Sequence, residues 1–341
     1  DCGSAHPEVF LIVCGSAASW IIKKILRNRG GLHNRVTRRM KIEPFTLAEC
    51  ENYFVDNEIS FERRDIAESY MIFGGVPFYL SLFDRRLSLP QNVDAICFSE
   101  NAPLKDEFEE VFYSLFKHAD LHIQIIKTLA RKKKGLYREE IVGGLDVTSG
   151  GGLTDALYEL EQSGFITVYD DYSGKNGRYC FRLTDAFSLF YLTYMAGRRK
   201  KDMRFWSTFT GQSAHNSWRG YAFVQVCFAH TAQIKDALGI AGLSASISTW
   251  RSRVSDPGAQ IDLIIERNDG VINLCEVKYT ADEYLIDKKY SEALRNKRDA
   301  FRSEINPKKT LHLTMISGGG LKTNAYSNIV QSVVTLEQLF Q

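Results

Sequence analysis

The sequence lacks long apolar runs, a large net charge and paired cysteine motifs. Its 341 residues carry a formal net charge of +2, so any basic surface must be local. The most apolar stretch, VFLIVCGSAASWII, is too short to span a bilayer. We therefore expect a cytoplasmic protein without a membrane partner.

The seven cysteines form no CxxC pair and no zinc-ligand spacing. Their number is odd, and several lie in apolar, strand-like runs. This usage is typical of reduced core cysteines in a cytosolic protein.

No G-x-x-x-x-G-K-[ST] phosphate loop occurs anywhere in the chain. The nearest match is SGKNG at 173–177, which has neither the spacing nor the hydroxyl residue. Because no loop is present to cradle phosphates, we do not expect the chain as given to hydrolyse ATP.

What the sequence does contain is a succession of helical and strand patterns. Thr46 and Glu49 predict a capping box at a helix start, and the Gly74-Gly75 pair with Pro77 predicts a helix break. An extended run at 9–14 and another near 39–42 predict strands.

The second half changes from a helical to an α/β pattern. Between about 103 and 195, three predicted helices are followed by a two-stranded wing with a turn-rich stretch, which is the winged-helix order. Predicted helices at 217–238 and 287–304 then alternate with strands, as in an α/β domain.

The segment QIDLIIERNDGVINLCEVKY, residues 260–279, predicts two strands joined by a tight turn. If the loop has three residues centred on Asp269, Asp262 lies directly opposite Glu276, and such residues share a face with Cβ atoms about 4.5–5.5 Å apart. Lys278 points to the same face as Glu276. A two-residue turn would instead separate the carboxylates.

Two adjacent carboxylates repel each other unless a positive group lies between them. Mg²⁺ held by Asp262 and Glu276 would offset this repulsion. Lys278 could then orient a nucleophile or stabilise the pentavalent phosphate of phosphodiester hydrolysis. The alternative interpretation is a salt-bridged trio on a partly wet sheet face.

The arrangement of this hairpin between two helices resembles the PD-(D/E)XK nuclease superfamily. The whole chain resembles bacterial AAA-type ATPases with a C-terminal nuclease-like domain of the DUF234 type. The motifs that carry this resemblance are FLIVCGSAASW, GGLHNRVTRR, IEPFTL, GGVPFYL, APLKDEF, FSLFYL, RGYAF and INLCEVKY.

The resemblance implies a multidomain α/β protein. The expected parts are the end of an AAA-type P-loop core (1–45), a helical lid (46–100), a winged helix (101–196), a basic linker (197–208) and a restriction-endonuclease-like domain (209–341). The ATP-binding phosphate loop would precede Asp1, and the ATPase part would support self-association.

The resemblance also implies roles for single residues. Ser16 matches a sensor near the terminal phosphate of a nucleotide, and Arg35 matches an arginine near the nucleotide or a subunit interface. In GYAFVQVC, Val224 stands where relatives carry a metal-binding glutamate. This departure argues against full nuclease activity.

DNA is the partner that the resemblance implies, but the expected recognition helix LTDALYELEQ carries acids and no Lys or Arg. Phosphate contacts require cations. The candidates are in the charge runs and the wing, namely Lys132, Lys133, Lys175, Arg178 and Arg199.

Two functions follow as hypotheses. The first is an ATP-driven protein whose nuclease-like domain binds or cuts DNA with Mg²⁺. The second is a non-catalytic module that keeps the nuclease fold and binds DNA or proteins.

Overall fold

The computed structural model describes residues 12, 15, 38 and 40–341, apart from 133, 146–149, 173–177, 199–201, 253 and 255–257. Within these residues, helices surround one mixed sheet of eight strands in the order β1-β3-β2-β4-β5-β6-β7-β8. The mixed α/β architecture that the sequence predicts is confirmed.

The first half of the described chain is helical. Its elements are α3 (Leu47–Asp56), α4 (Arg63–Phe73), α5 (Pro77–Leu80), α6 (Leu89–Val93), the π-helical turn η2 (Asp94–Phe98) and α7 (Glu107–Leu115). Thr46 and Glu49 form the predicted capping box at the start of α3. Gly74, with a φ of 61°, ends α4, and Pro77 begins α5 as predicted.

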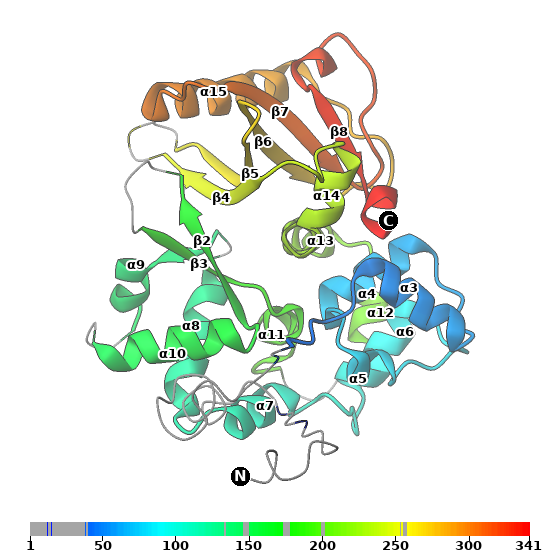
Figure 1. Cartoon of the computed structure of the whole chain (residues 1–341). Coiled ribbons are helices and arrows are strands. Elements are labelled where there is room, and N and C mark those ends of the chain that lie inside the picture. Colours follow the sequence, from blue (N-terminus) through cyan, green and yellow to red (C-terminus); the bar gives the residue numbers. More distant parts are fainter. Residues whose placement is uncertain are drawn as a thin grey trace, which may run out of the picture.

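A second group of elements combines helices with the first three strands. It contains α8 (Ala119–Arg131), β1 (Leu136–Tyr137), α9 (Arg138–Gly143), α10 (Gly151–Gln162), β2 (Ile166–Asp171), β3 (Tyr179–Leu183), α11 (Ala186–Phe190), η3 (Tyr191–Met195) and α12 (Phe205–Phe209). Strands β1, β3 and β2 pair antiparallel. In Figure 1, α8 and α10 lie below these strands.

The remaining elements build the larger part of the sheet. They are α13 (Ser213–Ala229), α14 (Thr231–Ala237), β4 (Ala245–Arg251), β5 (Gln260–Arg267), β6 (Val271–Lys278), α15 (Lys288–Ile305), β7 (Thr310–Ser317), η4 (Ser327–Ile329), β8 (Ser332–Thr335) and η5 (Leu336–Phe340). The predicted helix 217–238 is thus two helices, α13 and α14, which meet at His230.

Parallel pairing of β2 with β4 joins the two parts of the sheet, through Asp170–Ser248 and Asp171–Thr249. Strands β4, β5 and β6 then pair antiparallel, and β7 and β8 extend the sheet with parallel neighbours. Helix α15 covers one face of strands β4–β7, and α13 lies on the other (Figure 1).

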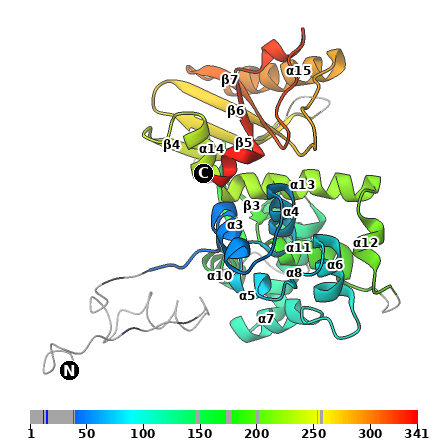
Figure 2. The ribbon, with the colours of Figure 1, turned by 90° about the vertical axis from the view of Figure 1, so that its right-hand side faces the viewer.

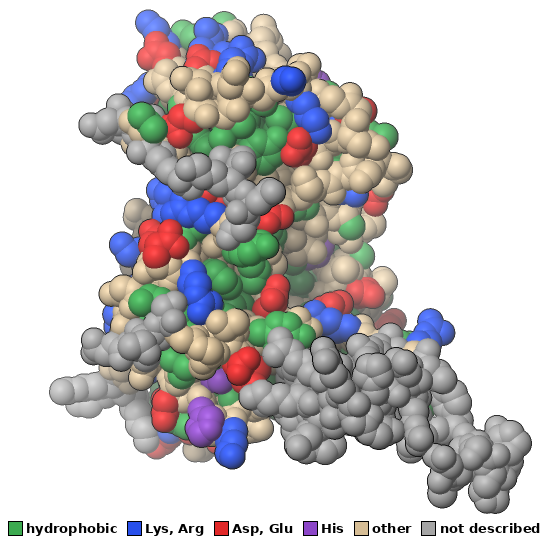
Figure 3. Space-filling model, turned by 60° about the vertical axis from the view of Figure 1, so that its left-hand side comes forward, with side chains coloured by type: hydrophobic (Ala, Val, Ile, Leu, Met, Phe, Trp, Pro, Cys, Tyr) green, Lys and Arg blue, Asp and Glu red, His purple; other side chains and the backbone are tan. Residues whose placement is uncertain are grey.

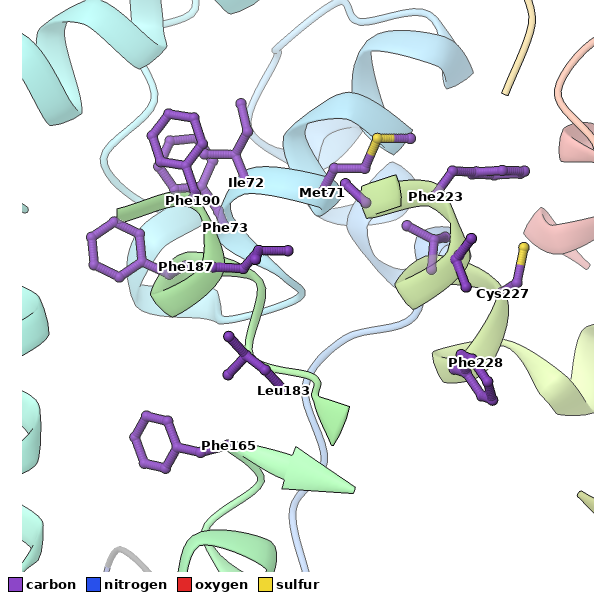
Figure 4. Close-up of a cluster of buried hydrophobic side chains, with 14 of the residues drawn as sticks. Met71, Ile72, Phe73, Phe165, Leu183, Phe187, Phe190, Phe223, Cys227 and Phe228 are labelled. Carbon is purple, nitrogen blue, oxygen red and sulfur yellow. The ribbon is translucent and has the colours of Figure 1, made fainter. Parts of the chain in front are cut away.

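Two apolar cores correspond to these two faces. The larger core joins α13 to the helical half, and Figure 4 shows part of it, with Met71 of α4 beside Phe223 of α13 and Phe73 of α4 beside Phe190 of α11. The smaller core lies between the sheet and α15, where the rings of Trp250 and Phe301 are 5.2 Å apart. Figure 2 shows the block formed by strands β4–β7 and α15 above the helical half.

Two further sequence predictions can be checked. The described cysteines (Cys50, Cys97, Cys180, Cys227 and Cys275) are buried and free of disulfides, as expected for core residues. In the described part of the chain, no helix combines the length and apolarity needed to cross a membrane.

Candidate functional site

The hairpin formed by β5 and β6 has the predicted register. Leu263 pairs with Cys275, and Ile265 pairs with Asn273, so the pairing is centred on Asp269. Gly270 follows with a φ of 88°, a backbone conformation that favours glycine. The three-residue turn expected from the sequence is therefore confirmed.

A β-bulge breaks the alternation of β5 near Asp262. Ser248 of β4 pairs with Ile264, whereas Trp250 pairs with Ile261, so three steps along β5 match two along β4. Ile261 and Ile264 both belong to the core beneath α15. The extra residue shifts the side chains between them toward the opposite face.

Asp262 accordingly contacts groups on the α13 side of the sheet. Its Oδ1 accepts a hydrogen bond of 2.6 Å from Gln260 Nε2 and lies 3.6 Å from Arg182 Nη1. The Arg182 guanidinium is 4.6 Å from the centre of the Phe228 ring of α13. Arg182 is 1% exposed, and within the described residues its three side-chain nitrogens have no hydrogen-bond partner.

Glu276 lies on the α15 side of the sheet. Lys297 Nζ donates a hydrogen bond of 2.8 Å to Glu276 Oε2, and Lys278 Nζ is 3.2 Å from Oε1. The hydroxyl of Tyr290 also donates to Oε1. Lys278 Nζ is 4.8 Å from the centre of the Tyr290 ring and 6.0 Å from that of Tyr284. We call these five residues the Glu276 cluster.

The cluster carries two ammonium groups and one carboxylate, so its net charge is positive. Burial alone would raise the pKa of Glu276, but Lys297, Lys278 and the hydrogen bonds from Lys297 and Tyr290 hold it below the ordinary value of 4.5. The pKa of the Tyr290 hydroxyl is raised by burial and by the charge of Glu276. Glu276 therefore stays ionised and Tyr290 stays neutral near pH 7.

The three residues expected to form a catalytic centre are thus only partly brought together. Glu276 and Lys278 are in contact, but the expected convergence of Asp262 with them is wrong. The register is as predicted, and the bulge in β5, together with Arg182 of β3, accounts for the different position of Asp262.

Val224 also lies away from the Glu276 cluster. It is 7% exposed and belongs to the core that includes α13, whereas the cluster is beneath α15. An acid at position 224 would therefore enter an apolar core and would not complete a ring of ligands around Glu276.

The residues present do not fit a Mg²⁺ site. Both Glu276 oxygens are engaged by groups that donate hydrogens, and two of these are cationic, whereas Mg²⁺ needs oxygen ligands in near-octahedral geometry. No group of three or more His, Cys, Asp or Glu side chains suited to a metal occurs in the described residues.

Five of the other predicted site residues lie outside the described residues, namely Ser16, Arg35, Lys133, Lys175 and Arg199.

Two predicted nucleic-acid contacts are described. Lys132 is exposed at the end of α8. Arg178 lies 3.5 Å above the centre of the Tyr137 ring and pairs with Glu139 at 2.8 Å. The charge of Arg178 is therefore already partly neutralised.

The α15 half of the cluster is not among the site residues that the sequence predicts. Tyr290 and Lys297 are seven residues apart, a spacing that places them on one face of a helix. Since helix 287–304 was predicted, this spacing could have identified both residues as neighbours of the strand that carries Glu276.

Comparison with known proteins does not assign this site. No protein-family model matches the chain, and no curated protein matches it significantly.

Proposed function

We propose that the chain is a DNA-binding module of nuclease-like fold that does not cleave its ligand. The Glu276 cluster carries this proposal, because two lysines and a tyrosine engage both oxygens of its carboxylate. The fusion of this module to an AAA-type ATPase core is also part of the proposal and rests on the sequence resemblance alone.

The order of elements supports the proposal at the level of fold. Helix α13, the strands β4–β6, α15 and β7 follow the order expected for a PD-(D/E)XK-like domain, and α8 to β3 follow the order expected for a winged helix. A retained fold can outlast its original chemistry, so function must be argued from the site.

The Glu276 cluster can bind a phosphate oxygen directly. Each ammonium group has three N–H donors, and the contacts to Glu276 leave donors available on both lysines. The side chains of Lys278 and Lys297 are 31% and 33% exposed, so a phosphodiester backbone can approach them. Tyr284 and Tyr290 add aromatic surface on which a base can stack.

The surroundings of the cluster are also basic. Helix α15 carries more Lys and Arg than Asp and Glu: Lys288, Lys289, Arg295, Lys297, Arg298 and Arg302 against Glu292, Asp299 and Glu304. Figure 3 shows Lys and Arg side chains among acidic ones at the end of the molecule that carries α15. Local positive charge of this kind attracts a polyanion although the whole chain is nearly neutral.

Binding can be tested by fluorescence anisotropy with labelled duplex and single-stranded DNA in EDTA. Lys297→Gln should weaken binding by about fivefold to tenfold and lower the magnitude of the salt slope by about 1. Lys309→Gln is the matched control, because Lys309 is also 33% exposed and paired with a glutamate at 2.8 Å, but near the turn of the hairpin. Lys309→Gln should leave affinity unchanged.

Three results would overturn the proposal. They are the absence of DNA binding in EDTA, equal effects of the two lysine substitutions, and Mg²⁺-dependent cleavage that disappears in Glu276→Gln. ATP binding by a longer chain that includes a phosphate loop would test the ATPase part separately.

A further inference from the structure

Two members of the Glu276 cluster are joined by a short segment of chain. Lys278 ends β6, and Tyr284 follows after residues 279–283, which we call the strap. Any movement of the strap therefore changes the positions of Lys278 and Tyr284.

One side of the strap packs against the turn after β7. Gly318 N–H donates to Lys278 O at 3.0 Å, and Tyr284 N–H donates to Gly320 O at 2.8 Å. A Cβ at Gly319 would lie 2.3 Å from the Asp282 carbonyl oxygen, so no side chain fits there. The strap is thus in direct backbone contact with this turn.

Helix α4 holds the other side of the strap. Arg64 Nη2 donates a hydrogen bond of 2.6 Å to the carbonyl of Ala281. The hydroxyl of Tyr279 lies 3.3 Å from Glu68 Oε1 and donates to it. Glu68 is held in turn by Arg219 of α13, whose guanidinium lies 5.4 Å from the centre of the Tyr279 ring.

We propose that α4 positions the Glu276 cluster through the strap, with Arg64 and Glu68 as the positioning residues. DNA affinity at the cluster is then coupled to the contacts that Arg64 and Glu68 make with the strap, and not to docking of α4 in general. This inference rests on the proposed function, since DNA is the ligand whose binding reports the coupling.

The same helix offers a second link that does not touch the strap. Arg63 pairs with Glu51 at 2.8 Å and with Glu337 at 2.7 Å, and its guanidinium lies 4.9 Å from the centre of the Phe340 ring. It thus joins α4 to η5 at the end of the chain. Arg63→Gln therefore weakens docking of α4 without altering a strap contact.

The test compares DNA affinity in Glu68→Ala, Arg64→Gln and Arg63→Gln by anisotropy with the same labelled duplex. Glu68→Ala and Arg64→Gln should each lower affinity by about fivefold, at the weak end of measured couplings between sites, while Arg63→Gln should change it less than about twofold. Glu68→Gln should restore most of the affinity, because its amide oxygen still accepts from Tyr279.

Hydrogen exchange supplies a readout that general destabilisation would not reproduce. In the wild-type protein, DNA should slow exchange at the amides of Tyr284 and Lys322, which bond to Gly320 O and Tyr284 O. By reciprocity of linked equilibria, this protection by DNA should be smaller in Glu68→Ala and unchanged in Arg63→Gln.

The inference fails if Glu68→Ala and Arg64→Gln bind DNA like the wild type while Lys297→Gln binds weakly. It fails equally if Arg63→Gln loses as much affinity as Glu68→Ala. Wild-type affinity in Lys297→Gln would instead count against the proposed function. Arg64 is exposed, so its variant should fold even if Glu68→Ala does not.

Discussion

The two faces of the β5–β6 hairpin accommodate charge in different ways. On the α15 face, Glu276 is surrounded by two lysines and a tyrosine that all contact its oxygens. On the α13 face, the more deeply buried Arg182 has one carboxylate at 3.6 Å and no hydrogen bond within the described residues. The first arrangement leaves cationic donors accessible to a ligand, whereas the second mainly links β3 to β5.

The comparison shows that strand register alone does not decide which side chains meet. Asp262 and Glu276 belong to strands with the predicted register. Because of the bulge in β5 and the contact with Arg182, however, Asp262 lies on the α13 face, whereas Glu276 lies on the α15 face. These two environments should therefore respond separately to substitution and to acid.

The largest effect should come from placing an acid in the α13 core. Val224→Glu buries a carboxylate without a partner and should reduce the free energy of unfolding by about 3 kcal/mol or more, without a gain in Mn²⁺ affinity. Val55→Glu is the control, since Val55 is 68% exposed on α3 and its substitution should stay within about 0.5 kcal/mol. Urea unfolding measures the stability of the two variants, and Mn²⁺ titration measures their metal affinity. Tighter Mn²⁺ binding by a folded Val224→Glu protein would contradict the assignment of Val224 to this core.

The next effect concerns the pair of Arg182 and Asp262. Asp262→Asn leaves a buried guanidinium without a counter-charge and should cost about 1–2 kcal/mol of unfolding free energy, less than for a fully buried pair because the carboxylate is 39% exposed. In an Arg182→Met background, the same substitution should cost less than about 0.5 kcal/mol. Equal costs in both backgrounds, measured by urea unfolding, would show that the ion pair contributes nothing.

Acid should affect the α13 side first. His230 Nε2 accepts from Leu47 N–H at 2.9 Å, and its Nδ1–H donates to Val226 O at 2.8 Å, so the imidazole must be neutral. Burial lowers its pKa below the ordinary 6.5. The unfolded state therefore binds the proton more readily than the folded state. The hydrogen bond that the neutral imidazole accepts from Leu47 should add about 1 kcal/mol to the free energy of unfolding. This stabilisation is complete above pH 6.5 and is lost as pH falls through the lowered pKa of His230. The stability difference between wild type and His230→Gln should follow this course; a difference independent of pH would contradict it.

The smallest effect should come from the α15 side at lower pH. Because the pKa of Glu276 lies below 4.5, its ion pairs stabilise the protein above that pH and are lost as pH falls through the lowered value. The expected contribution is under about 1 kcal/mol, since both lysines are partly exposed and salt screens them. Glu276→Gln should remove this acid dependence and leave that of His230 intact. If Glu276→Gln also changes the pH dependence of stability near pH 6.5, the two faces are not independent.

Much of the local structure could be predicted because it depends on neighbours in sequence. The Thr46–Glu49 capping box, the break at Gly74 and the turn at Gly270 each depend on residues within a few positions. The described cysteines are buried, as the apolar runs around several of the cysteines predict.

The composition of the candidate site could not be predicted in the same way. The position of Asp262 depends on a register shift against β4, and on Arg182, which is 80 residues away in sequence and lies on β3. The alternation of side chains in the hairpin predicts neither the register shift against β4 nor the position of Arg182. Glu276 and Lys278, two residues apart on one strand, needed only the alternation of side chains.

The parallel pairing of β2 with β4 also limits how the chain can be divided. Strand β4 has β2 on one side and β5 on the other, so a fragment limited to residues 209–341 would leave the outer edge of β4 uncovered near Ser248 and Thr249. The backbone N–H and C=O groups exposed there would offer a template for strands from other molecules. Such a truncated protein should aggregate through this edge, and polar or proline substitutions along β4 would be needed to keep it dispersed.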